Sequence, residues 1–311
     1  MIYEDIRDFP KQFEWRLETV NAEKLGHFSR FVVAGMGGSN LAADLLRIAR
    51  PDIDIAVHRD YGLPAWANKD TLVVLSSFSG DTEETLDAYR TAAEWKLPRF
   101  AIGAGGRLIA AAEKDGVPYI KFPEIRIQPR VAIGWSFLAL LKAVGDEELL
   151  AEAANLTGKI DIAGLDRNGK ELAGRFDGLM PVIYSSQHNR GLSYVWKINF
   201  NESAKIEAFA NVLPEVNHNE ISGFSGSGFF FLFLEDNGDH PRILKRFATT
   251  ERLLGEKGFK LERIGLAGSS PLEKIFNSVI FSHFTAYYLA TARGVEPEAV
   301  PLVEEFKRLI G

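Results

Sequence analysis

Short apolar runs, rich in β-branched and aromatic residues, alternate along this chain with segments whose apolar residues recur at helical spacing. In the first half, the runs are separated by amphipathic segments such as 39–49 and 81–95. The runs themselves are residues 30–35, 52–58, 71–77, 99–105 and 117–123. Nearly continuous apolar strands joined by helical crossovers are typical of a parallel sheet that is covered on both faces. The sequence therefore predicts an α/β fold built on a parallel sheet.

The same alternation restarts after the polar helical stretch 146–169, with further strands expected at 181–186 and 228–235. The chain has 311 residues, of which 46% are hydrophobic, so it exceeds the usual size of one compact domain. We therefore expect two α/β domains of similar layout, residues 1–150 and 151–311. One very large domain is the alternative.

Charge and residue usage exclude several kinds of partner. A net charge of −6 and a pI near 5.6, with no long basic run, give no reason to expect nucleic acid. The absence of cysteine excludes disulfides and thiolate metal sites, and it fits a cytoplasmic protein. No signal peptide is visible, and apolar stretches such as 228–234 are too short to cross a bilayer. We expect a cytoplasmic protein with neither nucleic acid nor membrane as a partner.

A glycine-rich loop, GMGGS at residues 35–39, joins the first predicted strand to the first helix. Gly37 and Gly38 let backbone amides approach a ligand closely, and a helix N-terminus favours an anion, so a phosphate is the expected ligand. The loop lacks the GK[ST] of a Walker sequence and has only two of the three glycines of the dinucleotide fingerprint. Because Asp60 ends the next strand, a nicotinamide site remains a rival interpretation. An ordinary tight turn is the third.

A second loop, SSFSGDTEET at residues 76–85, carries several hydroxyls at another corner between a strand and a helix. One such residue alone, Thr82 for example, is more simply interpreted as a helix N-cap. Ser77, Ser79 and Thr82 together exceed what capping requires. With Ser39 of the first loop they can surround a phosphate with neutral donors, without any lysine. Dinucleotide-binding folds do not need this second loop.

Together, GMGGS and SSFSGDTEET resemble the paired loops of sugar isomerase (SIS) domains. The block NFNESAKIEAFANVLPEVNHNEISG, residues 199–223, is similar to the archaeal-type bifunctional phosphoglucose/phosphomannose isomerases, and the similarity runs over most of the chain. The resemblance implies two tandem SIS subdomains, each a parallel sheet flanked by helices, usually paired as a homodimer with the active site at the subunit contact. It also implies interconversion of two hexose 6-phosphates, glucose 6-phosphate and fructose 6-phosphate, and often of mannose 6-phosphate, without metal or organic cofactor.

Isomerisation of such a sugar moves a proton between C1 and C2, which requires a base that can return the proton it takes. The resemblance places the catalytic glutamate of the family at Glu202; the alternative is a surface acid that pairs with Lys205 or caps a turn. His218 is the predicted acid-base group for ring opening, because an imidazole titrates near neutral pH. A structural histidine is the alternative. The six histidines show no spacing typical of a metal site, so no metal is expected.

Two cations complete the predicted site. Lys307 matches the C-terminal lysine of the family, which in the resemblance assists at the ring oxygen of the sugar. The family also has an arginine at the position of Arg130, where a guanidinium would stabilise the anionic enediolate intermediate. The alternatives are a solvated cation on an amphipathic terminal helix for Lys307, and a surface ion pair or a loop anchor for Arg130.

Three residues depart from the family pattern. Phe78 stands in place of tyrosine, Asp81 in place of asparagine and Val300 in place of threonine. The charge of Asp81 weakens phosphate binding unless the carboxylate points away or caps the helix. Valine keeps the volume of the threonine and loses its hydrogen bonds, so mannose 6-phosphate activity is less expected than glucose 6-phosphate activity. These changes leave open a different class of protein, a SIS-fold sensor that binds a sugar phosphate without turnover.

Overall fold

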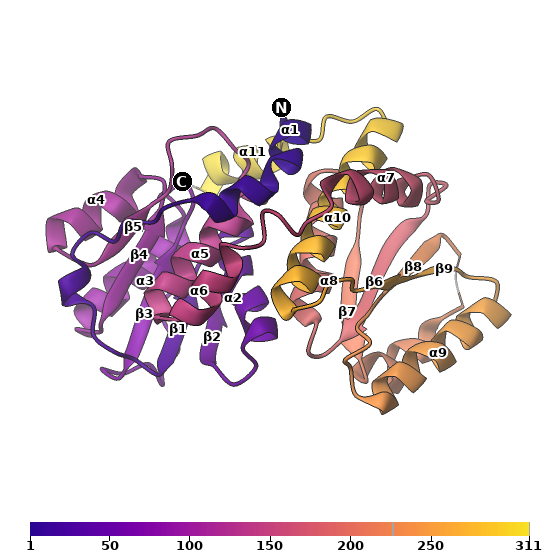
Figure 1. Ribbon diagram of the computed structural model, residues 1–311, viewed down its shortest axis with the longest axis horizontal. Coiled ribbons are helices and arrows are strands. Elements are labelled where there is room, and N and C mark those ends of the chain that lie inside the picture. The colour runs from indigo at the N-terminus through magenta and orange to yellow at the C-terminus, as the bar shows by residue number, and fades with distance from the viewer. Residues whose placement is uncertain (226, 311) are drawn as a thin grey trace. The chain divides into compact units, whose positions relative to one another are not determined.

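The chain divides into two compact units in a computed structural model that describes residues 1–225 and 227–310 (Figure 1). One unit is Asp8–Ile160, and the other combines Met1–Arg7 with the chain from Asp161 onward. The sequence predicts a division after residue 150, whereas this division falls ten residues later. The difference arises because the helix that follows residue 146 packs on the preceding helix of the first unit.

The unit Asp8–Ile160 contains a five-stranded parallel sheet in the order β2-β1-β3-β4-β5. Its strands are β1 (Arg30–Ala34), β2 (Asp54–His58), β3 (Thr71–Ser76), β4 (Arg99–Gly103) and β5 (Tyr119–Lys121). All six residues of β3 are buried, as expected for a central strand that is covered on both faces. The predicted α/β fold with a parallel sheet is confirmed for this unit.

Helices cover both faces of this sheet. The helices are α2 (Gly38–Ala49), α3 (Glu83–Glu94), α4 (Gly106–Asp115), α5 (Ile133–Val144) and α6 (Glu147–Ala153), and two 3₁₀ turns, η1 (Phe9–Glu14) and η2 (Ala22–Lys24), precede the sheet. Side chains of α3 and α4 share one apolar cluster with Val32, Val73 and Leu75 of the strands. On α5, which packs against α2, ten of the 12 residues are buried, so this helix is a core element.

The strand order creates one special position at the carboxyl edge of the sheet. From β1 the chain crosses through α2 to β2 on one side, and from β3 it crosses through α3 to β4 on the other. The loops after β1 and β3 therefore diverge at a topological switch point, where open α/β sheets bind their ligands. These are the two loops in which the sequence predicts phosphate binding.

The second unit has a four-stranded parallel sheet in the order β7-β6-β8-β9, so its switch point lies between β6 and β8. The strands are β6 (Met180–Ser186), β7 (Phe209–Leu213), β8 (Phe229–Glu235) and β9 (Lys260–Gly265). Its helices are α1 (Ile2–Arg7), α7 (Ile162–Ala173), α8 (Arg190–Glu202), α9 (Pro241–Glu256), α10 (Pro271–Ala292) and α11 (Pro301–Ile310), with 3₁₀ turns η3 (Glu215–His218) and η4 (Glu220–Gly223). Both units thus repeat one layout.

The N-terminal helix α1 belongs to the second unit because two tyrosines share one carboxylate there. The hydroxyls of Tyr3 and Tyr288 donate to the two oxygens of Asp166 at 2.8 and 2.6 Å. The hydrogen bond to Asp166 raises the pKa of Tyr3, and burial together with the same carboxylate raises the pKa of Tyr288. Both phenols are therefore held neutral in the folded state.

This arrangement predicts a loss of stability in alkali. An unfolded tyrosine ionises near pH 10, so above that pH the unfolded state loses protons before the folded state does, and the free energy of unfolding falls as the pH rises. Urea unfolding between pH 8 and pH 11 measures this slope. The double variant Tyr3→Phe/Tyr288→Phe is expected to flatten it, and an unchanged slope in that variant would contradict the assignment.

Among the residues that the structure describes, no helix combines the length and apolar character that a bilayer crossing requires. Within the same residues, no group of three histidine or carboxylate side chains has the arrangement of a metal site.

Candidate active site

The first predicted phosphate loop leads into the start of α2. Gly37 has a positive φ of 51° and occupies the N-cap position. A Cβ on Gly38 would stand 3.0 Å from the carbonyl oxygen of Pro129 and 3.1 Å from the amide nitrogen of Arg130. The absence of a side chain at Gly38 thus lets the segment that carries Arg130 approach the beginning of α2. The structure brings these predicted residues together within one unit.

The second loop is bonded directly to the first. The Ser39 hydroxyl accepts a hydrogen bond from the amide of Phe78 at 2.9 Å, and the Ser76 hydroxyl donates to the carbonyl of Ser39 at 2.7 Å. Two hydrogen bonds thus join the loops after β1 and β3 at the switch point of the sheet. Asp60, the residue expected for a nicotinamide site, is exposed and accepts a hydrogen bond from the amide of its own neighbour Tyr61 at 2.8 Å.

Hydroxyls also organise the second loop internally. Ser77 is fully buried; its hydroxyl lies 2.8 Å from that of Thr82 and accepts from the amide of Gly80 at 3.0 Å. Ser79 is exposed, and its hydroxyl accepts from the amide of Asp81 at 3.2 Å. Thr82 does occupy the N-cap of α3, but its side chain makes no capping hydrogen bond. The hydroxyls of Ser77, Ser79 and Thr82 therefore bond within the loop and do not cap α3.

A third loop, residues 104–107 after β4, supports the second, and sequence reasoning did not assign it to the site. Gly80 has a φ of 77°, and a Cβ there would overlap the carbonyl oxygen of Gly105. The carbonyl of Gly80 accepts from the amide of Leu108 at 2.9 Å. The pair of glycines at the end of a neighbouring strand was the only available signal for this role.

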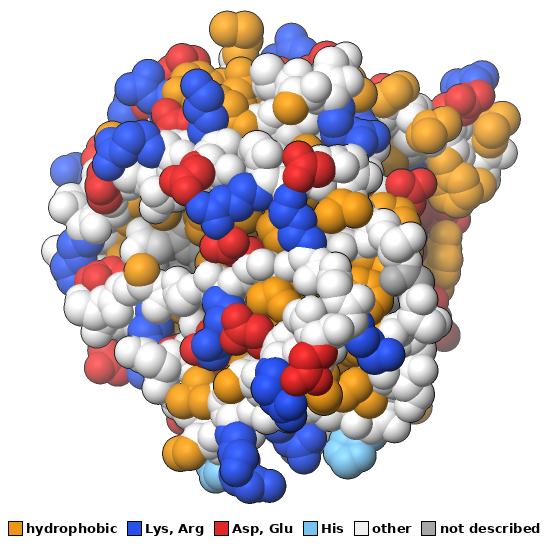
Figure 2. Space-filling view, turned by 90° about the vertical axis from the view of Figure 1, so that its right-hand side faces the viewer, with side chains coloured by type: hydrophobic (Ala, Val, Ile, Leu, Met, Phe, Trp, Pro, Cys, Tyr) orange, Lys and Arg blue, Asp and Glu red, His pale blue; other side chains and the backbone are white. Residues whose placement is uncertain are grey.

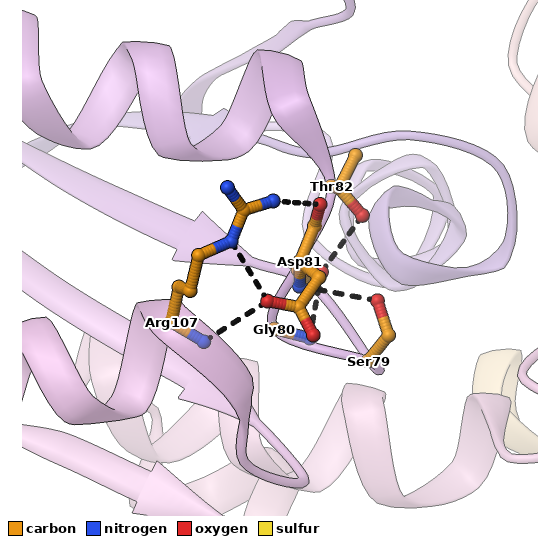
Figure 3. A network of polar contacts seen from close by, with 6 residues as sticks. Ser79, Gly80, Asp81, Thr82 and Arg107 are labelled. Carbon is orange, nitrogen blue, oxygen red and sulfur yellow. Dashed lines mark hydrogen bonds and ion pairs between the residues drawn. The ribbon is translucent and has the colours of Figure 1, made fainter. Parts of the chain in front are cut away.

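The charge of Asp81 is neutralised by Arg107 (Figure 3). One oxygen of Asp81 accepts from the main-chain amide of Arg107 at 3.1 Å and from its Nε at 3.0 Å, while Nη2 donates to the carbonyl of Asp81 at 3.3 Å. These bonds from the backbone and side chain of Arg107 hold the pKa of Asp81 below its ordinary value. The carboxylate thus accepts from the start of α4 rather than from α3, the helix of its own loop, and its charge is paired with that of Arg107.

Arg130 is not a surface cation. Its side chain is only 2% exposed, and its Nη1 donates to the side-chain oxygen of Gln128 at 3.3 Å. An arginine buried to this degree keeps its charge and requires polar or anionic neighbours. The alternative of a surface ion pair is therefore wrong for this residue.

Glu202 is the last residue of α8, at half-buried depth. The turn that follows is fixed by two side chains: the ammonium of Lys205 donates to the main-chain carbonyl of Glu202, and the Asn201 amide donates to the carbonyl of Ile206 at 2.9 Å. Lys205 itself has a φ of 53°. The end of the helix is thus a defined platform for the carboxylate.

His218 ends the 3₁₀ turn η3 and is exposed. The flanking residues fix this segment, because Asn219 donates to Glu215 at 2.6 Å and the carboxylate of Glu220 accepts from Tyr184 and Asn211 of strands β6 and β7. The imidazole is thereby presented to solvent from a segment that is tied to the sheet.

Lys307 and Val300 lie at the C-terminal end of the second unit. All ten residues of α11, Lys307 among them, are exposed. Val300 directly precedes α11, and its carbonyl accepts from the amides of Val303 and Glu304 at 3.0 and 3.1 Å. Val300 is therefore the residue from which the helix starts.

Comparison with known proteins identifies the family. The model of the bacterial phospho-glucose isomerase C-terminal SIS domain matches residues 165–310. A bifunctional phosphoglucose/phosphomannose isomerase of Aquifex aeolicus is 30% identical over 98% of this chain and 97% of its own. One from Thermoplasma volcanium is 33% identical over 92% and 93%. This chain belongs to the bifunctional phosphoglucose/phosphomannose isomerase family. The predicted resemblance is confirmed.

Solved structures agree on the SIS fold of this family. A putative phosphosugar isomerase from Clostridium difficile superposes with a TM-score of 0.71 over 96% of this chain and 95% of its own, at 15% identity. At that identity the likeness concerns the fold alone. Two SIS subdomains, each a parallel sheet flanked by helices, are therefore confirmed.

The residues predicted for an isomerase of this family fall into two sets. The unit Asp8–Ile160 holds Gly37, Gly38, Ser39, Ser77, Ser79, Thr82 and Arg130, and the unit that starts at Asp161 holds Glu202, His218, Val300 and Lys307. The first set forms one connected group of loops at a switch point. Arg107, which neutralises Asp81, is the side chain that sequence reasoning missed, since nothing in the spacing of two residues 26 positions apart indicates their contact.

The corresponding switch point of the second unit has a different character. The loop after β8 carries Asp236, which is 9% exposed and accepts from the ammonium of Lys274 at 2.6 Å and from the amide of Gly238 at 2.8 Å. Burial alone would raise the pKa of Asp236, but these two bonds hold it below its ordinary value. Burial raises the pKa of the nearby Asp239. The loop after β8 thus carries carboxylates, while the neighbouring strand β6 ends in the buried serines Ser185 and Ser186.

Proposed function

We propose that this protein is an aldose-ketose isomerase that interconverts glucose 6-phosphate and fructose 6-phosphate and also accepts mannose 6-phosphate. The observation that carries the proposal is the pair of hydroxyl-rich loops, bonded to each other, at the switch point between β1 and β3. The family membership supports it, because the relatives are phosphoglucose/phosphomannose isomerases by name.

In this proposal the phosphate is bound by neutral groups. The amides of Gly37 and Gly38, at the start of α2, are joined by the hydroxyls of Ser39, Ser79 and Thr82. Ser77, which the sequence also predicts to bind phosphate, is fully buried and is assigned instead to position the second loop. Helix N-termini and backbone amides attract phosphate without a lysine. The neutral Asp81–Arg107 pair adds little net charge nearby, which supports binding of a dianion.

Glu202 is assigned the proton transfer. After ring opening, its carboxylate removes the C2 proton of the aldose; the electron pair forms the C1–C2 double bond of a cis-enediolate, and the electrons of the C1 carbonyl move to O1. A proton then passes from O2 to O1, and the same carboxylate returns its proton to C1 as the C2 carbonyl forms, which gives the ketose. Arg130 is assigned to stabilise the negative charge of the enediolate, and its burial supports this role because charge interactions strengthen where water is excluded. His218 and Lys307 are assigned to ring opening.

A homodimer and a cytoplasmic location belong to the same proposal. The apolar side chains of α11 support the dimer, because Leu302, Phe306 and Leu309 are 79%, 60% and 71% exposed. Apolar surface of this kind favours burial against another surface, for which a second copy is the proposed partner. Sedimentation of the protein, with and without α11, measures the oligomeric state.

The direct test supplies fructose 6-phosphate in the presence of EDTA and measures glucose 6-phosphate and mannose 6-phosphate separately. We expect both products and exchange of the C1 or C2 hydrogen with solvent. A folded protein that forms neither product would contradict the proposal. Binding of the sugar phosphate without hydrogen exchange would instead favour the sensor that binds without turnover. The charge of Asp81 no longer supports that alternative, because Arg107 neutralises it.

Val300 is predicted to limit the share of mannose 6-phosphate. Val300→Thr adds a hydroxyl that can hold a water, which is worth about 1 kcal/mol, so the ratio of mannose 6-phosphate to glucose 6-phosphate should rise about fivefold. Because Val300 starts α11, the threonine can also cap that helix. Capping alone would change both rates equally, so an unchanged product ratio would contradict the role in epimer selection.

Arg107 is predicted to act by neutralising Asp81 rather than by binding phosphate. Arg107→Ala leaves an uncompensated carboxylate and should raise KM for fructose 6-phosphate about fivefold, on the order of 1 kcal/mol for an exposed pair. Adding Asp81→Asn should restore KM, because the asparagine keeps the hydrogen-bond acceptor and removes the charge. A double variant as impaired as Arg107→Ala would instead show that the guanidinium contacts the substrate.

A further inference from the structure

The second unit contains a cavity that the proposed reaction does not use. Its volume is about 270 Å³. It lies between the turns η3 and η4 on one side and α9 on the other. The residues that line it include Asn217, Ile221, Arg242, Lys245, Arg246 and Thr250.

Three cations converge on this cavity. Arg242, Lys245 and Arg246 stand at i, i+3 and i+4 on α9, so they share one face of the helix. Among the described residues, none of the three lies within 4 Å of a carboxylate, and no acidic side chain lines the cavity. In a chain whose net charge is −6, three grouped cations without acidic partners are an unusual arrangement.

The acidic residues of the same elements are engaged elsewhere. On α9, Glu251 pairs with Arg263 at 3.3 Å and Glu256 pairs with Arg252 at 2.8 Å. On the opposite side, the carboxylate of Glu220 accepts from Tyr184 and Asn211. Figure 2, which views the side of the molecule where α9 lies, shows lysine and arginine side chains gathered along its lower edge. The charge of the cavity is therefore positive.

Part of the cavity is already ordered for a ligand. The guanidinium of Arg246 donates to the side-chain oxygen of Asn217 at 3.2 Å, and the amide of Asn217 donates to the hydroxyl of Thr250 at 2.9 Å. These bonds fix one arginine, while Arg242 and Lys245 remain exposed at the mouth. A fixed guanidinium beside exposed cations and a threonine hydroxyl matches the needs of a phosphate group, which arginine binds through two parallel hydrogen bonds.

We propose that this cavity binds a small phosphate-bearing metabolite with two or more negative charges, at a site separate from the serine loops of the first unit. The volume is close to the lower limit of small-molecule pockets, which suits a ligand no larger than a diphosphate or a three-carbon phosphate ester.

Asn217 connects the cavity to His218, a residue of the proposed active site. Asn217 directly precedes His218 in η3 and is the residue that holds Arg246. A phosphate that engages Arg246 competes with or reorients the bond to Asn217, so the imidazole environment of His218 changes. The change at the imidazole of His218 can be measured directly by NMR. Only the effect of that change on turnover rests on the proposed function.

Isothermal titration calorimetry with inorganic pyrophosphate at 0.15 M salt tests the site. The informative variant is Arg242→Ala/Lys245→Ala, and the matched control is Arg252→Ala, which removes a cation of the same helix that is paired with Glu256. We expect the double variant to lose one binding site, or to bind at least tenfold more weakly, while the control binds like the wild type. Because only α9 is varied, this comparison does not depend on whether the serine loops bind phosphate.

Identical isotherms for the wild type and the double variant would overturn the proposal, as would equal weakening by Arg252→Ala, which indicates general charge attraction. Should the double variant fail to fold, Lys245→Gln replaces it. Failure to bind pyrophosphate together with altered sedimentation of the double variant would assign the cavity to a protein interface instead.

Proton NMR of the histidine rings tests the link to His218, with its signal identified by its loss in His218→Gln. Pyrophosphate should shift that signal in the wild type and not in Arg242→Ala/Lys245→Ala. If pyrophosphate binds while the His218 signal does not shift, the coupling between the cavity and His218 would be wrong, and the binding site itself would stand.

Discussion

Glu202→Gln is expected to lower kcat for fructose 6-phosphate isomerisation by about 10³-fold, which corresponds to roughly 4 kcal/mol of lost transition-state stabilisation. The amide has the shape of the carboxylate and can still accept a hydrogen bond, but it cannot take the C2 proton and return it to C1. KM should change by no more than about threefold, because the loops proposed to bind the phosphate belong to the other unit. Steady-state rates and exchange of the substrate hydrogen with deuterated water measure both quantities.

The matched control is Glu207→Gln, which removes a carboxylate five residues further along the chain, from an exposed position. It should isomerise at the wild-type rate. If Glu202→Gln retained that rate as well, or if it lost activity only through a higher KM, the assignment of proton transfer to Glu202 would be wrong.

Gly80→Ala is expected to lower the free energy of unfolding of the first unit by about 3 kcal/mol, because a Cβ would overlap the carbonyl of Gly105 and because alanine disfavours a φ of 77°. The melting temperature should fall by roughly 10 °C. The second loop would have to move away from residues 104–107, so KM for the sugar phosphate should rise as well.

The variant Gly145→Ala separates the two causes of destabilisation, which are the overlap of the Cβ with another loop and the unfavourable φ. Gly145 has a φ of 76°, almost that of Gly80, but a Cβ there would meet no atom within 4 Å. Its destabilisation should therefore be limited to the backbone term, about 1 kcal/mol, with KM unchanged. Thermal unfolding and steady-state kinetics of the two variants provide the comparison, and equal effects would show that the contact between the loops is not required.

The sequence predicts the sheets well where burial leaves little choice. The run 71–77 corresponds to β3, which lies at Thr71–Ser76 and is buried on both faces, so its composition alone identifies it. The edge strand β7 was missed because Phe209 is exposed and only its last two residues are buried, which leaves no continuous apolar run. Without an apolar run, this strand carries no clear signal in the sequence.

Contacts between residues far apart in the sequence limit how much of the candidate site can be predicted. The glycines and hydroxyls of the two loops are local signals, and the structure joins them at one sheet edge. The pairing of Asp81 with Arg107 and that of Tyr3 with Asp166 depend on how strands and helices pack, and no spacing rule connects residues 26 or 163 positions apart. The assignments of Glu202, His218 and Lys307 rest on the resemblance and stay predictions.

The two switch points of this chain have the same topology and carry different polar groups. Hydroxyls and amides face the edge of the first sheet, whereas Asp236 and Asp239 occupy the edge of the second. Asp236 is paired with Lys274, so an internal ion pair occupies the second edge, whereas neutral hydroxyls and amides join the two loops of the first edge. If the proposed roles hold, variants of the serine loops should change the affinity for the phosphate, and variants of Val300 should change which sugar is transformed.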